Sequence, residues 1–313
     1  PVLGGNASNE IGIMPRGAQG ATLRELSQRT PDGDLVAFSL LQKEPNASVF
    51  IENRVVDVKM DGRSISTVDS VHARTGKELR FSARMFIDAS GVAMLGVLAG
   101  AETMFGREAQ SEYNESYAPE EADDMHHGNT LFFRTKMADH PIKFPEVPWA
   151  TEVSKDYANL SGQLVKPGQD NGPGPIAGDN PLTPEFKFGN DVFPATHFWE
   201  YGQWLDPYTS GELVRDYLMR ALFGTFSNVK NLDPEQYANL EFDWMAHVAA
   251  KGEYRRYRGD YVLCETDIRQ HTYFNDAVIG NDGSFCIHCA FEEGEAEYDF
   301  RLKDWIWDSR DHA

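Results

Sequence analysis

Residues 79–91 read LRFSARMFIDASG, and this stretch decides the fold that the sequence predicts. The three consecutive apolar residues 85–87 are typical of a strand buried on both faces in a parallel sheet. The run ends in the small residues 89–91 and is followed by VAMLGVLAGA (92–101), which has the composition of an apolar helix. Open α/β sheets bind ligands where a strand ends, so we predict an α/β fold with a site at this turn.

The residues before this stretch predict a β-hairpin. Residues 48–62 and 64–76 are rich in β-branched residues and alternate in polarity, and Asp61-Gly62 between them is a strong hairpin signal. Further upstream, residues 17–30 and 34–45 predict helices. The hairpin therefore reads as an insertion into a sheet-based domain.

Composition excludes two classes of protein. The 313 residues carry a formal net charge of −20, and the only dense basic stretch, KGEYRRYRGD (251–260), is short, so binding to nucleic acid is not expected. No apolar run approaches the roughly 20 residues that span a bilayer. Three cysteines are too few for a disulfide framework, which favours a reducing compartment and a cytoplasmic location.

The middle of the chain is mixed in character. Residues 131–137 predict a strand, and residues 139–195 are crowded with Pro and Gly and predict a long irregular loop. A helix is predicted from Thr209, with Glu212 completing a capping box and Gly224 ending it. A second helix is predicted from Asp233 through the segment ending near residue 250.

These patterns divide the chain into three parts. Residues 1–105 form a sheet-based domain with the hairpin insertion, and residues 106–260 form a large mixed segment. Residues 261–313 read as strands and turns that return toward the first domain. The last part contains Cys286 and Cys289 in C-x-x-C spacing. Two cysteines are too few ligands for a tetrahedral zinc site, so no metal site is predicted. We favour cysteines without a functional role over a redox-active pair.

The first residues, PVLGGNASNE (1–10), form a candidate ligand loop. Gly4 and Gly5 can adopt positive φ and let the backbone approach a ring or a phosphate closely, and Asn6 and Ser8 could then form hydrogen bonds to that ligand. A plain turn is the alternative.

Several stretches, in order, carry a resemblance to a known family. The chain resembles the bacterial FAD-dependent oxidoreductase family of the glutathione-reductase-like superfamily over roughly residues 1–290. The matching stretches are VLGGNASNEI, ELRFSARMFIDASG, LAGAE, Gly106-Arg107-Glu108, Ala118-Pro119-Glu120, HFWEYGQW and KGEYRRYRGDYVL. The resemblance implies a partial FAD/NAD(P)-binding Rossmann-like domain with a β-hairpin insertion and a large mixed cap domain.

The chain also departs from the pattern of that family. Val92 stands where an acidic residue is usual, and Ser90 where threonine is usual. Gly252 and Tyr254 replace an arginine and a serine. The first strand with its G-x-G-x-x-G turn and a C-terminal segment are not found in the sequence, so we expect a fragment or truncated form that binds FAD poorly by itself.

The resemblance and the residue types together name the candidate site. Arg255 and Arg256 are catalytic candidates because a guanidinium can clamp a carboxylate or stabilise a developing oxyanion, and His288 is a candidate acid or base. Surface ion pairs and a structural histidine are the alternatives. The predicted cofactor-binding residues are Gly4, Gly5, Asn6, Ser8, Val55, Ala89, Ser90 and Gly91; Val55 corresponds to the strand that lines the adenine in this superfamily.

The resemblance implies an FAD-dependent oxidoreductase that transfers a hydride between a small organic or sugar-derived substrate and the flavin. One alternative is a non-catalytic module that binds carbohydrate or a partner chain through the Trp- and Tyr-rich segment. Another is a hydrolase with a carboxylate pair, for which no pair stands out.

Overall fold

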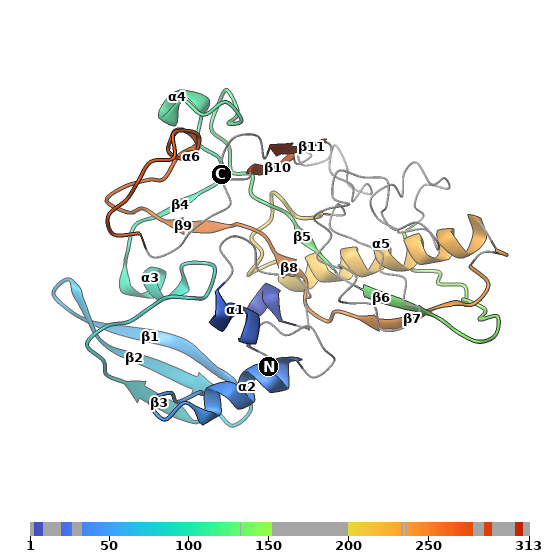
Figure 1. The fold of residues 1–313 in the computed structure, drawn as a ribbon, viewed down its shortest axis with the longest axis horizontal. Coiled ribbons are helices and arrows are strands. Elements are labelled where there is room, and N and C mark those ends of the chain that lie inside the picture. Colours follow the sequence, from blue (N-terminus) through green and yellow to red (C-terminus); the bar gives the residue numbers. More distant parts are fainter. Residues whose placement is uncertain are drawn as a thin grey trace.

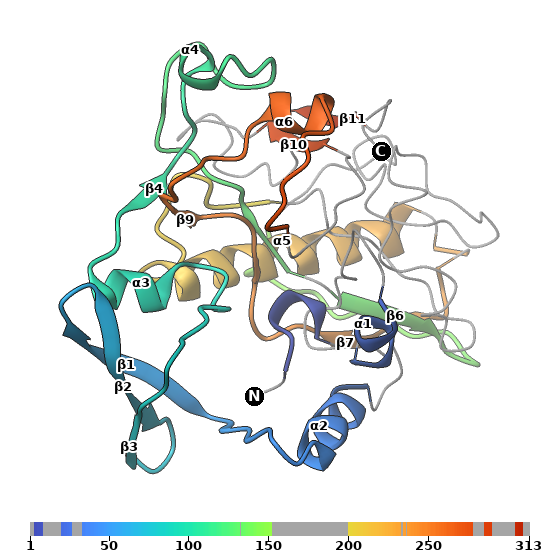
Figure 2. The ribbon, with the colours of Figure 1, turned by 60° about the vertical axis from the view of Figure 1, so that its left-hand side comes forward.

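The structure is a computed structural model that describes residues 3–8, 20–26, 33–131, 133–151, 200–232, 234–235, 237–277, 285–289 and 304–308. Helices and strands are mixed, and the strands form small antiparallel sheets (Figure 1). The sheet β1–β3 lies at one end of the described part and helix α5 with β6 and β7 at the other, with the N-terminal segment between them (Figures 1 and 2).

The predicted hairpin is confirmed. Strands β1 (Asn53–Asp61) and β2 (Ser64–His72) pair antiparallel, and β3 (Glu78–Phe81) extends the sheet on the far side of β2. Gly62 and Gly76 form the two turns with φ of 58° and 69°, a region that only glycine adopts without cost. Register shifts in β1 between Val55 and Asp57 leave Val56 as a bulge.

The buried strand predicted over 85–87 is wrong. After β3 the chain continues through residues 82–92 as an extended loop without ladder pairing to any described strand, and Met85 and Ile87 are 77% and 83% exposed. An apolar run becomes a strand only if a neighbouring strand supplies backbone partners, and every pairing among the described strands is antiparallel and involves other residues. The helix predicted after the run is confirmed as α3 (Met94–Ala99), which packs against β1.

The remaining elements are short, apart from two helices. The described helical segments are η1 (Gly5–Ala7), α1 (Ala21–Leu26), α2 (Gly33–Lys43), α4 (Gln110–Tyr113), α5 (Gly211–Leu232) and α6 (Glu265–Arg269). The described strands are β4 (Thr103–Phe105), β5 (Asn129–Thr130), β6 (Phe133–Met137), β7 (Leu240–Met245), β8 (Ala250–Lys251), β9 (Arg255–Tyr257), β10 (Phe285–Cys289) and β11 (Asp304–Asp308). The helices predicted over 17–30 and 34–45 appear as α1 and α2, and most of the predicted loop 139–195 lies outside the described residues.

A hydrophobic core forms between α5 and strand β7, which pairs antiparallel with β6. Val214, Leu218 and Leu222 on one face of α5 are each at most 3% exposed, and Phe226 stacks on Phe242 of β7 at 4.0 Å between ring centroids. The prediction that Gly224 ends this helix is wrong. A glycine inside a helix costs about 1 kcal/mol, and burial of the following aromatic turn outweighs that cost.

Two further predictions in the second half are corrected. The helix predicted from Asp233 is instead strand β7 in the segment 240–245, which pairs with β6. Leu240, Phe242 and Trp244 alternate with acidic residues in LEFDWM, which is the period of a strand and not of a helix. The segment predicted as strand near residue 265 is helix α6, because Cys264 and Asp267 form a capping box at its start.

Candidate functional site

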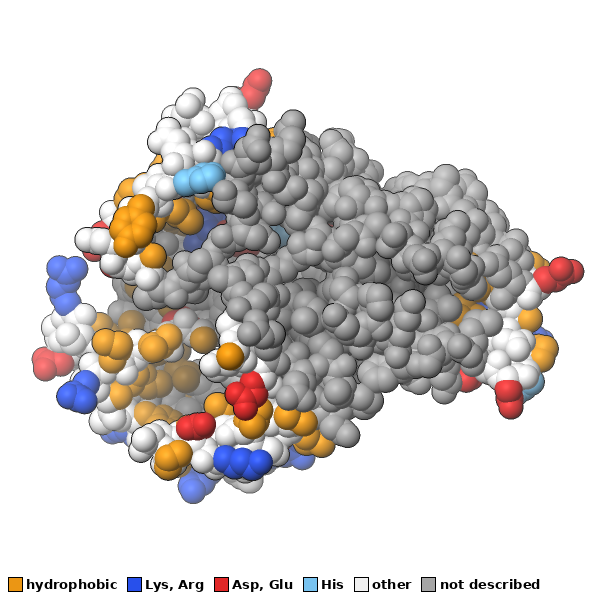
Figure 3. All heavy atoms as spheres, in the orientation of Figure 1, with side chains coloured by type: hydrophobic (Ala, Val, Ile, Leu, Met, Phe, Trp, Pro, Cys, Tyr) orange, Lys and Arg blue, Asp and Glu red, His pale blue; other side chains and the backbone are white. Residues whose placement is uncertain are grey.

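A pocket of about 1440 Å³ opens between the N-terminal segment, the β1–β3 sheet, the loop 86–92 and β8. Figure 3 shows the molecular surface hollowed over this region, with hydrophobic side chains around the rim. Ligand pockets for small molecules usually measure about 300–1000 Å³, so this one is large enough for an extended ligand. All eight predicted cofactor-binding residues line it: Gly4, Gly5, Asn6, Ser8, Val55, Ala89, Ser90 and Gly91.

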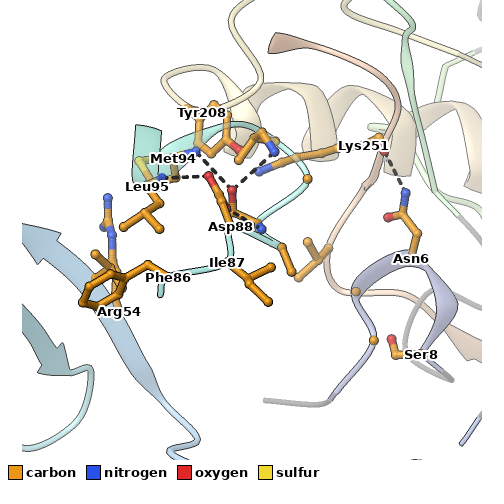
Figure 4. Close-up of a pocket in the computed structure, with 18 of the residues that line it drawn as sticks. Asn6, Ser8, Arg54, Phe86, Ile87, Asp88, Met94, Leu95, Tyr208 and Lys251 are labelled. Atoms are coloured by element: carbon orange, nitrogen blue, oxygen red, sulfur yellow. Dashed lines mark hydrogen bonds between the residues drawn. The ribbon is translucent and has the colours of Figure 1, made fainter. Parts of the chain in front are cut away.

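The N-terminal wall of the pocket is a single tight turn, η1. Gly4 and Gly5 have φ of 99° and 53°, and the Ser8 N–H closes the turn by donating to the Gly5 carbonyl at 3.0 Å. The Asn6 side-chain amide donates to the Lys251 carbonyl at 2.8 Å, which fixes the turn to β8 (Figure 4). Ser8 is 2% exposed, and its hydroxyl has no hydrogen-bond partner among the described residues, so it could bind a ligand group.

The opposite wall is the loop that carries Asp88, and its conformation depends on that carboxylate. Asp88 accepts hydrogen bonds from the backbone N–H groups of Ser90 at 2.8 Å and Leu95 at 3.0 Å. Ser90 Oγ accepts from the Met94 N–H at 3.1 Å. Gly91 then turns with φ of 75°, and a Cβ added there would meet no atom within 4 Å. The backbone at residues 89–91 is therefore open toward the pocket.

Tyr257 of β9 ties this loop to the other half of the molecule. Its hydroxyl donates to Asp88 and accepts the Gly96 N–H at 2.8 Å. A Cβ on Gly96 would lie 1.9 Å from the Tyr257 ring, so glycine is required for this approach. Burial by itself raises the pKa of Asp88, but the hydrogen bonds from Tyr257, Ser90 and Leu95 outweigh it and hold the pKa below the usual 3.8.

The long floor of the pocket belongs to the first sheet. Arg54 and Val55 of β1, Val68 of β2 and Phe81 of β3 line it. The bulge at Val56 adjoins this position, and such bulges commonly re-aim side chains near binding sites. In Figure 4, Arg54 and Phe86 lie at one end of the pocket, away from Asn6 and Lys251.

Sequence reasoning missed the pocket residues from the second half of the chain, which are Tyr208, Val248, Ala249, Lys251 and Gly252; Lys251 and Tyr208 are the two with polar side chains. The Lys251 ammonium lies over the Tyr208 ring at 4.5 Å from the centroid. Burial lowers the pKa of Lys251 below its usual 10.5, and the Asp206 carboxylate opposes that shift. One signal was available: Lys251 opens the only dense basic stretch of an acidic chain, directly after the apolar residues 248–250.

Neither predicted catalytic arginine is among the described residues that line the pocket. Arg255 lies over the Tyr254 ring at 5.3 Å. The Arg256 guanidinium donates to the Gly106 carbonyl at 2.9 Å and to Glu108 at 2.8 Å, which matches the ion-pair alternative. His288 lies on β10, opposite Trp305 of β11, and its side chain lies outside the described part.

Comparison with known proteins identifies the family. A model of the family described as FAD dependent oxidoreductase matches residues 2–303. The chain belongs to this family. Its cofactor is therefore FAD, and the family is one of flavin-linked redox enzymes. No curated protein and no solved structure matches the chain.

The pocket fits this cofactor. Gly5 and Gly91 leave open space where a side chain would otherwise project, Ser8 provides an unpaired buried hydroxyl, and Ile87 exposes an apolar side chain along the wall. A dinucleotide with a flat ring needs close backbone approach, apolar surface and a few hydrogen-bonding groups, and these residues supply all three.

The departures from the family pattern have local structural reasons. A Cβ on Gly252 would lie 1.9 Å from the His127 ring, so the arginine usual in the family could enter only if that ring moved. Tyr254, in place of serine, is 6% exposed and packs edge-on against Phe105 and His126 at 4.9 and 5.0 Å. Among the described helices, none is long and apolar enough to cross a membrane.

Proposed function

We propose that this chain is an oxidoreductase that transfers a hydride between a small organic or sugar-derived substrate and FAD bound in the pocket. The observation that carries the proposal is the convergence of two stretches more than 80 residues apart, Gly4–Ser8 and 89–91, on one open cavity. When bound, the flavin supplies the hydride acceptor or donor.

We assign the chain's own residues to holding and orienting the cofactor. Gly4, Gly5 and Gly91 have no side chain, so the cofactor can approach the backbone closely at these positions. The Ser8 hydroxyl donates or accepts a hydrogen bond at the edge of the cofactor. Asp88 acts on the cofactor indirectly, because its carboxylate fixes the wall at residues 89–91. Val55 borders the far end of the same pocket on β1.

We propose that different parts of the chain form different sides of the pocket. Residues 1–105 contribute most of the wall that contacts the cofactor, and residues 106–260 contribute the side from which the substrate enters. Residues 261–313 return toward the first part. The contact between Asn6 and Lys251, and the presence of Tyr208 in the pocket, support a site formed between the first two parts. Arg255 is the stronger of the two arginine candidates for substrate contact, because its charge acts on Tyr208 and Asp206 at the pocket edge.

The alternative of a non-catalytic module receives no support from the family. Two residues of its supposed aromatic surface also pack inward: Tyr201 is 7% exposed and stacks on Tyr217 at 4.9 Å, and Trp204 packs against the core of α5.

The proposal is tested by adding FAD to the purified protein and following flavin absorbance and fluorescence. We expect weak but saturable binding of one FAD per chain, followed by bleaching of the bound flavin with at least one member of a panel of small alcohols, hydroxy acids and sugars. A protein that binds no FAD under any of these conditions would contradict the assignment.

A further inference from the structure

Lys251 is a half-buried positive charge for which the described part of the chain provides no ion-pair partner. Its side chain lines the pocket, and its described contact is the face of the Tyr208 ring at 4.5 Å. A buried charge is costly unless an opposite charge or hydrogen bonds compensate it. An ammonium group directed into a large pocket therefore indicates an anionic group in the ligand.

The two neighbouring carboxylates are already bound to other donors. Asp206 accepts the N–H groups of Tyr208 at 2.8 Å and Thr209 at 3.3 Å. Asp88 accepts hydrogen bonds from Tyr257 and from two backbone N–H groups. Neither carboxylate forms an ion pair with Lys251, so its charge remains directed at the pocket.

The position of Lys251 indicates which part of the ligand carries the negative charge. It lies on β8, on the wall that residues 106–260 contribute, and Figure 4 shows it extending toward Asp88 at the opposite end of the pocket from Arg54. A hydride can move only where the substrate and the redox-active ring meet. Under the proposed function, the substrate approaches from the side of residues 106–260, so the ring lies near Lys251.

We propose that Lys251 supplies the positive charge that stabilises the reduced flavin and so raises its reduction potential. This inference rests on the proposed function. A substrate that is oxidised gives up a hydride, which carries two electrons and one proton, and releases its second proton to solvent. The transfer leaves one negative charge on the reduced ring, and a nearby cation favours that state.

The experiment compares three variants by the midpoint potential of the bound flavin. Lys251→Met removes the charge and Lys251→Arg keeps it. Lys77→Met is the matched control, because Lys77 is an exposed lysine in the turn before β3 and does not line the pocket. We expect Lys251→Met to shift the reduction equilibrium toward oxidised flavin by about tenfold, or about 30 mV for a two-electron couple, while the other two variants stay within a few millivolts of the wild type.

A second measurement separates the ring from the phosphates of the cofactor. Binding of FAD and of ADP is titrated to each variant, since ADP carries the phosphates without the ring. The proposal expects the affinity for ADP to be the same in Lys251→Met and in the wild type. A parallel loss of affinity for ADP and FAD would mean that Lys251 faces the phosphates and would overturn the proposal.

Two other outcomes would also overturn it: an unchanged potential in Lys251→Met with FAD still bound, or an equal drop in Lys251→Met and Lys251→Arg. Thermal unfolding of each apoprotein checks that the variants fold, and Lys251→Gln replaces Lys251→Met if the latter does not. Failure of the wild type to bind FAD would instead contradict the proposed function, which keeps the two failures distinct.

Discussion

Replacing Gly91 by leucine tests the central geometric claim, that the wall at residues 89–91 faces the cofactor. Gly91 has φ of 75°, and Gly76, in the turn between β2 and β3, has φ of 69°. At both positions a new Cβ would meet no atom within 4 Å. Gly91 lines the pocket and Gly76 does not, so Gly76→Leu is a control with the same backbone cost and no ligand.

The structure gives the expected size of each effect. A side chain in the left-handed region costs about 1–2 kcal/mol, so both variants should lose about that much free energy of unfolding. Only Gly91→Leu places four extra carbons in the pocket. We expect it to weaken FAD binding at least tenfold, which is about 1.4 kcal/mol, whereas Gly76→Leu keeps the affinity of the wild type.

The two effects are measured separately. Urea unfolding of the apoproteins gives the loss of stability, and titration with FAD followed by fluorescence gives the dissociation constant. If Gly91→Leu binds FAD as tightly as Gly76→Leu, the turn at residues 89–91 does not face the cofactor, and the reasoning that joined it to Gly4–Ser8 fails.

Further predictions follow from single side chains. Ser8→Ala should leave stability nearly unchanged, because the buried hydroxyl has no hydrogen-bond partner among the described residues, but should weaken FAD binding by about 0.5–1.5 kcal/mol, as titration against the wild type would reveal. Tyr257→Phe removes the donor to Asp88 and should cost about 0.5–1.5 kcal/mol in urea unfolding; a double-mutant cycle with Asp88→Asn that gives no coupling would contradict a stabilising Tyr257–Asp88 hydrogen bond. The pKa of Asp88 is lower in the folded state than 3.8, so its contribution to stability is present above that value and is lost as the pH falls below it; Asp88→Asn should flatten this acid limb of the stability curve. The hydrogen bond to Asp267 raises the pKa of Tyr261 to about 12, so its contribution is complete below pH 10 and is lost as the pH rises toward 12; ultraviolet titration of Tyr261→Phe should lack this late-ionising group.

Local sequence patterns correctly predicted those parts of the fold that depend on the conformational preferences of a few neighbouring residues. Asp61-Gly62 set the β1–β2 hairpin because glycine adopts its φ of 58° without strain. The capping pattern at Thr209 located the start of α5 only to within two residues, because the helix begins at Gly211 with Glu212 in its first turn. The apolar run at 85–87 misled, because hydrophobicity alone does not tell a buried strand from an exposed loop that lines a pocket. That difference depends on whether other strands are present to pair with it.

In the candidate site too, some residues could be predicted from the sequence and others could not. Small residues at Gly4, Gly5 and 89–91 could be read directly, because a backbone that must be approached closely needs residues without bulk. Lys251 could not be placed in this way. Its position depends on the pairing of Thr130 with Ala250 in β5 and β8, 120 residues apart, and on the hydrogen bond from Asn6.

The sequence by itself therefore determined the turns, the hairpin, the family and the two glycine-bearing walls, since each depends on neighbours within a few residues or on an ordered series of short motifs. Only the tertiary structure decided that these walls face one pocket, that Tyr257 holds Asp88, and that a lysine from β8 directs its charge into the same space. Contacts of this kind join residues 80 to 245 positions apart, and the free energy that selects them comes from packing the whole chain, which no short window of sequence contains.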